Sequence, residues 1–398
     1  MDCRRREILE WMDGHREELV ALSRDLISIP TVSSYPDAKE QYQRLNAYLI
    51  RKGSLFGLQH TLCQNGNAGQ NLILKLPGSG GGKSLAIGGH ADVVPAEEDG
   101  WGSGSGFSPW VQDGRLYGRG AADMKCGLTA AFLAMRALAE NRVPLKGDLL
   151  LIASVDEEIG GSDGMKFLAE TGKVRPDYFI NAEQTGLDVM TRYKGVCHIT
   201  VTVSGRSAHG SMPYSGVNAI EGAAAMIEAV CAGTRMLARD SVLGEPTVNV
   251  GLIRGGTARN IVADKCTFTL DVRMVRGQTS GSVLEDIRRI TGAEMEKRPG
   301  LVVQTEVLRA TECVEIPESD PLVSALIRNG AEIGRTMRCG SYISAGDCWH
   351  LLKKGHTALM CGPGNVSEIH RANEFVTLSE VLEAAKLYAL TAMDICGR

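Results

Sequence analysis

The pattern of apolar residues changes character near Tyr193, and this change constrains the fold more than any other feature of the sequence. Before it, short apolar strands alternate with helical segments, of which 124–140 has the clearest helical periodicity. Such alternation is typical of a mostly parallel α/β sheet, so we predict an α/β domain that begins with residues 1–192. The strands predicted in this part are 71–78, 84–92, 147–154 and 177–185.

After Tyr193, the segment 196–205 alternates between apolar and polar residues with the period of a half-buried strand. The elements that follow complete the order β-α-β-β-α-β, which is a ferredoxin-like unit. We therefore predict an inserted α+β domain at 193–308, and the first domain resumes at 309–398. The further helices expected are 5–29, 39–52, 217–238, 279–297, 320–334 and 378–394, and the further strands are 247–253, 266–274, 301–308 and 356–362.

Composition excludes several classes of function. The net charge of -4 across 398 residues gives no basic footprint for nucleic acid. No apolar run reaches the length of about 18 residues that a membrane span needs, and no apolar stretch of a secretory signal follows the basic start. The 11 cysteines include no CxxC pair, so we expect reduced thiols in a cytoplasmic protein and no structural zinc on cysteine clusters.

Acids and histidines follow the predicted strands of the first domain at the points where those strands end. In an open α/β sheet, ligands bind outside the carboxyl ends of the strands, so we expect these side chains to converge. Imidazole and carboxylate are ligands of zinc, and a divalent cation relieves the repulsion between crowded carboxylates. The residues concerned are His90, Asp92, Asp123, Asp156, Glu157, Glu158, Glu183 and His370.

Each of these residues also has an ordinary explanation when it is taken singly. Asp123 could be the N-cap of the helix at 124–140, and the acids at 156–158 could form a solvated turn. A histidine at a strand end is usually a surface or core residue. It is the convergence of all of them that favours a metal site.

Two glycine-rich motifs suggest other chemistry. The segment 77–84 nearly matches a phosphate-binding loop, but Pro77 stands where that loop needs glycine and a strand follows, so we interpret it as a turn. Ser162 lies in a GxSxG match, but Glu157, Glu158 and Ile159 stand between this match and the strand before it, so Ser162 is not on a sharp turn. Capping of the next helix by Ser162 or Asp163 explains it. A serine hydrolase that uses Ser162 remains a minor alternative, as does a non-catalytic binding protein on this fold.

Six motifs together resemble the di-zinc aminoacylase and carboxypeptidase family, which includes acetylornithine deacetylase, succinyl-diaminopimelate desuccinylase, glutamate carboxypeptidases and dipeptidases. The resemblance runs nearly end to end and keeps the family's order. It implies a zinc-binding α/β catalytic domain with an inserted α+β lid domain through which relatives often form homodimers. The motifs are GHADVVP at 89–95, GRGAADMKCG at 118–127, DEEIGG at 156–161, NAEQT at 181–185, SAHGSMP at 207–213 and GGTARNIVADKC at 255–266.

The resemblance implies two zinc ions in each subunit, although such sites also accept cobalt or manganese. His90, Asp123 and Glu183 would hold one ion, and Asp123, Glu158 and His370 the other, so that Asp123 bridges them. Asp92 would orient the His90 imidazole. Because neighbouring side chains point in different directions, Glu158 can bind metal while Glu157 acts as the general base.

The lid domain supplies further residues by resemblance. His209 would donate a hydrogen bond to the oxyanion, in some relatives from the partner subunit. Asn260 and Arg273 would hold a substrate carboxylate, and Gly346 would form a wall of the site. For Arg273, an ion pair on the face of its strand is the alternative.

The substrate expected from the resemblance is a small molecule with a carboxylate. Glu183 in place of aspartate fits the deacylase and carboxypeptidase branches better than the aminopeptidase branch. We therefore predict hydrolysis of an N-acyl amino acid of the deacetylase or desuccinylase type, with a dipeptidase or carboxypeptidase as the alternative. Two positions depart from the family: Cys126, where relatives usually carry glycine and where the larger side chain could crowd the helix start, and Met212, where they often carry arginine.

Overall fold

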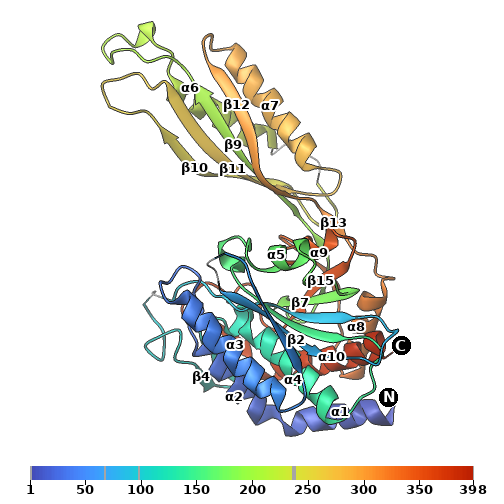
Figure 1. The fold of residues 1–398 in the computed structure, drawn as a ribbon. Helices are drawn as coiled ribbons and strands as arrows, with labels where there is room; N and C mark the ends of the chain where they lie inside the picture. The colour runs from blue at the N-terminus through green and yellow to red at the C-terminus, as the bar shows by residue number, and fades with distance from the viewer. Residues whose placement is uncertain (1, 67–68, 97–98, 235–238, 398) are drawn as a thin grey trace. The chain divides into compact units, whose positions relative to one another are not determined.

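The computed structural model describes residues 2–66, 69–96, 99–234 and 239–397 and divides the chain into two compact units (Figure 1). Unit 1 comprises Met1–Thr191, Ile316–Gly340 and Gly346–Arg398, and unit 2 comprises Arg192–Glu315 and Ser341–Ala345. Unit 2 thus extends past the boundary predicted at 308, because the strand expected at 301–308 continues to Thr311. Each unit is described by itself below.

Unit 1 is built on a sheet whose four central strands are all parallel. They lie in the order β6 (Leu149–Ser154), β3 (Leu85–His90), β7 (Tyr178–Gln184) and β15 (Thr357–Gly362). Their sequences are almost continuously apolar because helices cover both faces of a parallel sheet. Antiparallel strands extend the sheet at both edges: β1 (Gln59–Gln64) and β2 (Gln70–Leu76) on one side, and β8 (Val189–Tyr193) and β13 (Val314–Glu315) on the other. The short strand β14 (Cys339–Tyr342) also pairs with β8.

Helices α4 (Cys126–Glu140) and α10 (Leu378–Cys396) lie on one face of this sheet, and the short helices α5 (Met165–Glu170) and α9 (Cys348–Leu352) lie on the other (Figure 1). Almost every residue of α4 is buried, as its small and apolar sequence requires. A small separate sheet consists of β4 (Trp110–Gln112), β5 (Arg115–Tyr117) and β16 (Phe375–Thr377). The remaining helices are α1 (Cys3–Gly14), α2 (Arg16–Ile27), α3 (Ala38–Ser54) and α8 (Pro321–Glu332).

The structure differs from two local predictions in unit 1. The helix expected at 5–29 is two helices, which are separated at His15, whose ring stacks on Trp11 with a centroid distance of 3.6 Å. Strand β1 was not predicted, because five of its six residues are exposed and its sequence lacks the alternation of a half-buried strand. None of the helices in the described part of the chain is both long and apolar enough to cross a membrane.

Unit 2 contains the predicted β-α-β-β-α-β order as β9 (Gly195–Ser204), α6 (Ala219–Thr234), β10 (Thr247–Gly255), β11 (Lys265–Met274), α7 (Ser280–Glu296) and β12 (Val302–Thr311). The sheet order β10-β11-β9-β12, antiparallel throughout, is that of a ferredoxin-like unit. The predicted α/β fold with an α+β insertion is therefore confirmed. The end of the helix expected at 217–238, residues 235–238, lies outside the described residues.

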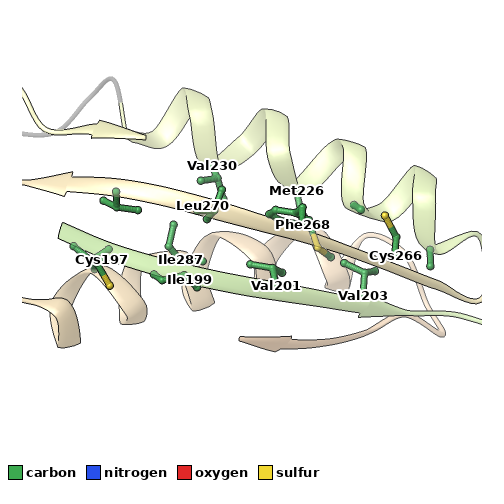
Figure 2. Packing of buried hydrophobic residues seen from close by; sticks show 14 of the residues in the cluster. Cys197, Ile199, Val201, Val203, Met226, Val230, Cys266, Phe268, Leu270 and Ile287 are labelled. Carbon is green, nitrogen blue, oxygen red and sulfur yellow. The ribbon is translucent and has the colours of Figure 1, made fainter. Parts of the chain in front are cut away.

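One face of the unit 2 sheet forms the hydrophobic core of this unit. Alternate residues of β9 and β11, such as Val201 and Phe268, are fully buried against Met226 and Val230 of α6 and Ile287 of α7 (Figure 2). The intervening residues of both strands are only partly buried, as the period-two pattern predicts.

Phe268→Ala should lower the free energy of unfolding of unit 2 by about 3–5 kcal/mol, because it removes a ring from a fully packed core. Thermal or urea unfolding of the whole chain would measure this change. The matched control is Leu308→Ala, whose side chain is 58% exposed and which should change stability by less than about 0.5 kcal/mol. Equal losses from the two substitutions would contradict this description of the core.

Candidate metal centre

The residues predicted to bind metal lie at the carboxyl ends of the four parallel strands of unit 1. β3 ends at His90, β7 carries Glu183 next to its last residue, and Glu158 follows β6. His370 lies in the loop that follows β15. Because these strands are neighbours in the sheet, the four segments reach the same edge.

Asp123 comes from the segment Ala121–Lys125, which leads into α4. The start of α4 packs closely against β7, since a Cβ atom at Gly127 would lie only 2.3 Å from the carbonyl oxygen of Ala182. Glycine at 127 therefore allows the contact that brings Asp123 next to Glu183. Cys126 is fully buried at the first residue of a regular helix, so the helix start accommodates its side chain.

The two predicted histidines share the Asp123 carboxylate. His90 Nε2 lies 3.0 Å from Asp123 Oδ1 and 3.3 Å from Glu183 Oε1. His370 Nε2 lies 3.2 Å from Asp123 Oδ2 and 3.4 Å from Glu158 Oε2. The structure thus brings all five predicted ligands together, and Asp123 presents one oxygen to each imidazole.

The nitrogen and oxygen atoms that meet here fit a binding site for a cation. His90 Nδ1 lies 3.0 Å from the backbone carbonyl of Asp92. A carbonyl oxygen can only accept a hydrogen bond, so Nδ1 carries the proton of the neutral ring. The lone pair of Nε2 then points at one oxygen of Asp123 and one of Glu183. That contact is repulsive unless a proton or a metal ion lies between. Glu158 Oε1 is buried and has no hydrogen-bond partner within the described part of the chain. Imidazoles and carboxylates in this number suit zinc and related divalent ions.

The pKa values in the metal-free site follow from the same contacts. Hydrogen bonds to Asp123 and Glu158 raise the pKa of His370 to about 10. Burial opposes the charged form of His90, but the nearby carboxylates of Glu183 and Asp123 raise its pKa well above the usual value. Burial also opposes ionisation of Asp123, yet the two imidazoles hold its pKa below the usual range. Protons on the imidazoles therefore balance the carboxylates when no metal is bound.

Asp92 organises the site in two ways. Its backbone carbonyl fixes the His90 ring, while its carboxylate lies 3.6 Å from His90 Nδ1. The same carboxylate accepts hydrogen bonds from the backbone N–H groups of Glu157 and Glu158, at 3.3 and 3.0 Å, and from the Ser33 hydroxyl. Asp92 thereby holds the turn that presents both glutamates.

Two residues of the site, one before the turn of Glu157 and Glu158 and one in the loop after β15, have an unusual backbone conformation. Asp156 has a φ of 64° and His370 a φ of 58°, both in the left-handed region that residues other than glycine rarely adopt. Such conformations concentrate at functional sites. Gly346 lies beside this turn, since a Cβ atom there would come within 3.7 Å of Glu157 Oε1. Gly346 is therefore a neighbour of the Glu157 side chain.

A cavity of about 560 Å³ opens beside the exposed side of His370, whose side chain is 47% exposed. The other residues that line it are Val94, Pro95, Asp99, Arg119, Arg371 and Ala372.

Two buried residues near Asp123 were not identified from the sequence. Glu374 and Arg119 are fully buried and paired at 2.7 Å, and Glu374 also accepts a hydrogen bond from the Asp123 backbone N–H. Arg119 lies inside a motif that we had noted, whereas Glu374 follows His370 by four residues in a polar loop. Nothing in the local sequence signals that a glutamate in such a loop is buried.

Unit 2 carries His209, Asn260 and Arg273. His209 and Ile261 form an antiparallel bridge, and the Gly210 N–H donates to the Asn260 carbonyl at 2.8 Å, so His209 and Asn260 are neighbours. The Ser211 backbone N–H, at 3.2 Å, and the Ser211 hydroxyl, at 2.7 Å, both reach His209 Nδ1, and acceptance from the N–H is compatible with a proton on Nε2.

Arg273 forms a two-point ion pair with Asp271 on the strand face. Its Nε and Nη2 atoms lie 3.0 Å from the two Asp271 oxygens. This is the alternative that the sequence left open for Arg273, and a substrate carboxylate would have to bind the guanidinium beside Asp271.

The structure excludes the cap that was the alternative for Asp123 and corrects the cap predicted for Ser162 or Asp163. Asp123 lies inside an irregular segment before α4 and does not cap that helix. Neither Ser162 nor Asp163 caps α5, whose N-cap is Gly164, because the Asp163 carboxylate instead accepts a hydrogen bond from Asn65. Ser162 is exposed, and no hydrogen bond joins it to a histidine within the described residues. The residues 77–84 form the predicted turn between β2 and β3.

Comparison with known proteins identifies the family. Residues 86–394 match the sequence model of Peptidase family M20/M25/M40. The chain is 30% identical over 333 residues to acetylornithine deacetylase of Myxococcus xanthus, covering 82% of this chain and 84% of that enzyme. It is 28% identical over 399 residues to acetylornithine deacetylase of Edwardsiella ictaluri, covering 97% and 100%.

Solved structures share the fold at low identity. Aminopeptidase PepT from Bacillus cereus superposes with a TM-score of 0.76 at 21% identity, covering 96% of this chain and 98% of that one. A dinuclear metal-binding peptidase from Bacillus subtilis gives 0.74 at 16% identity, covering 97% and 99%. The site and fold are those of a metal-dependent hydrolase. The chain belongs to Peptidase family M20/M25/M40, as its motifs predicted.

Metal binding should release protons from this site near neutral pH. His370, with a pKa of about 10, and Glu183, whose pKa burial raises to about 7, hold protons that a metal ion must displace. A group with a raised pKa keeps its proton below that pKa, so metal affinity should rise as pH rises toward 10. Titration calorimetry of zinc into the metal-free protein in buffers of different ionisation enthalpy measures this release. A binding enthalpy independent of the buffer would contradict it.

Proposed function

We propose that the chain hydrolyses the amide bond of an N-acyl amino acid, as a deacetylase or desuccinylase, with two zinc ions bound in unit 1. The observation that carries this proposal is the convergence of two imidazoles and three carboxylates around Asp123 in a member of this family. The acetylornithine deacetylases that align with nearly the whole chain support the substrate class. A dipeptidase or carboxypeptidase is the alternative, which structural similarity to human carnosine dipeptidase 1 supports.

Five residues would hold the metal ions in this proposal. His90 and Glu183 would bind one, His370 and Glu158 would bind the other, and Asp123 would bind both through its two oxygens. Bound divalent ions lower the pKa of a water molecule and polarise a carbonyl group. Cobalt or manganese could replace zinc with the same ligands.

Glu157 would act as the general base. It accepts a proton from the attacking water while the water oxygen forms a bond to the amide carbon. It then donates that proton to the amide nitrogen as the carbon–nitrogen bond breaks, which leaves a carboxylic acid and an amine, and the proton of the acid then passes to the amine. The Asp92 carboxylate holds the Glu157 backbone, and Gly346 leaves room beside the Glu157 side chain.

The unit 2 residues would act on the substrate. His209, with its proton on Nε2, can donate a hydrogen bond to the oxyanion, and the Ser211 N–H favours this tautomer. Asn260 and Arg273 would bind the substrate carboxylate. We further propose a homodimer formed through unit 2, which leaves open whether His209 serves its own subunit or its partner. The 11 free cysteines support a reducing compartment such as the cytoplasm.

Glu157→Ala should abolish hydrolysis of N-acyl amino acids while zinc content stays at the level of the unchanged protein, because Glu157 would move a proton and bind no metal. Turnover and metal content are measured on the same sample, with a panel that also includes dipeptides. Chelation of the unchanged protein serves as the companion experiment and should remove activity. Persistent turnover in Glu157→Ala would refute the base, and activity without metal would refute the proposed chemistry.

Arg273→Met should raise KM by about 10-fold or more for substrates with a free carboxylate, since a charge-assisted pair contributes roughly 1.5–3 kcal/mol. KM for the matching carboxamide substrates should change little. The control is Arg276→Met, which removes another ion-paired arginine of unit 2. If Arg273→Met raises KM equally for both substrate types, the guanidinium forms only the ion pair with Asp271 and does not bind the substrate carboxylate.

A further inference from the structure

A buried ion pair joins the loop that carries Asp123 to the segment that carries His370. The Glu374 carboxylate is fully buried, and its Oε2 atom accepts a hydrogen bond from Arg119 Nη1 at 2.7 Å. Arg119 also donates from Nε to the Pro95 carbonyl and from Nη1 to the Arg371 carbonyl, at 3.2 and 3.3 Å. The pair therefore contacts the loops that follow His90 and His370.

The other oxygen of Glu374 binds the loop before α4 directly. Oε1 accepts hydrogen bonds from the backbone N–H groups of Gly120, Ala122 and Asp123, at 3.0, 3.0 and 3.1 Å. This segment is not a regular helix, and buried N–H groups need an acceptor. A single carboxylate oxygen supplies that acceptor, so the direction of the Asp123 peptide depends on Glu374.

Two further contacts hold Glu374 in place. Its backbone carbonyl accepts a hydrogen bond from the Gly118 N–H at 2.9 Å, and the next residue, Phe375, pairs with Tyr117 in the small sheet. The Trp101 ring lies over the Arg119 guanidinium at 5.3 Å and shields it from solvent. The carboxylate, its arginine and the Asp123 loop thus form one buried unit.

We propose that Arg119 and Glu374 are positioning residues, which hold the Asp123 carboxylate between His90 and His370 and so couple the two halves of the metal centre. The inference rests on the proposed function in that it assigns the centre two metal ions. Neither residue would touch metal or substrate. Second-layer partners of this kind typically change metal affinity by about 10–100-fold.

Glu374→Gln tests the proposal. An amide cannot accept from three N–H groups with one atom and from Arg119 with the other, so the variant should bind Zn²⁺ about 10–100-fold more weakly in competition with a chelator. The visible spectrum of the Co²⁺-loaded variant should also change. In the metal-free variant, the amide hydrogens of Gly120, Ala122 and Asp123 should exchange faster with solvent.

Glu332→Gln is the control, because it removes one of the two carboxylate partners of Arg5 elsewhere in the same unit, at 2.8 Å. It should reproduce any general loss of stability and leave metal affinity, the Co²⁺ spectrum and exchange at residues 120–123 unchanged. Arg119→Lys keeps the positive charge beside Glu374 but loses the hydrogen bonds to the Pro95 and Arg371 carbonyls. It should therefore weaken Zn²⁺ binding less than Glu374→Gln does. If Glu374→Gln does not fold, Arg119→Lys alone decides the question.

Folded variants with Zn²⁺ affinity within twofold of the unchanged protein, and with unchanged amide exchange at 120–123, would overturn the positioning role. This failure differs from a failure of the proposed function. If the proposed function failed, the unchanged protein would bind metal without hydrolysing amides. Weaker Zn²⁺ binding and faster amide exchange in Glu374→Gln would then still support the positioning role.

Discussion

The candidate site depends on one shared carboxylate. Asp123 directs one oxygen at His90 and the other at His370, so two imidazoles from opposite ends of the sequence meet on a single residue. Ionised groups this deeply buried are stable only when opposite charges balance them. The strands, turns and buried side chains around Asp123 bring the opposite charges that balance its carboxylate.

The parallel sheet provides the first part of this support. Its four central strands end side by side, which converts residues far apart in sequence into one cluster at a single edge. The loops provide the second part, because Asp92 holds the turn of Glu157 and Glu158, and Glu374 holds the loop of Asp123. The sheet thus determines where the ligands meet, and buried carboxylates determine how they point.

Much of this could be predicted from the sequence, for physical reasons. Apolar strands that end in acids or histidines indicate both the parallel sheet and the edge where His90 and Glu183 meet, and period-two alternation indicates the separate unit that contains Phe268. The features that were not predicted leave no periodic pattern of apolar residues in the sequence. Glu374 is a charged residue in a polar loop, and β1 is mostly exposed. Asp156 has a left-handed backbone at the start of a turn whose next two N–H groups bind the distant Asp92.

The most direct test of the shared carboxylate is anomalous X-ray scattering at the zinc edge from crystals of the zinc-loaded protein. The account predicts two peaks in each subunit. One should contact His90 and Glu183, the other should contact His370 and Glu158, and both should contact Asp123. A single peak, or two peaks that do not share Asp123, would contradict the account.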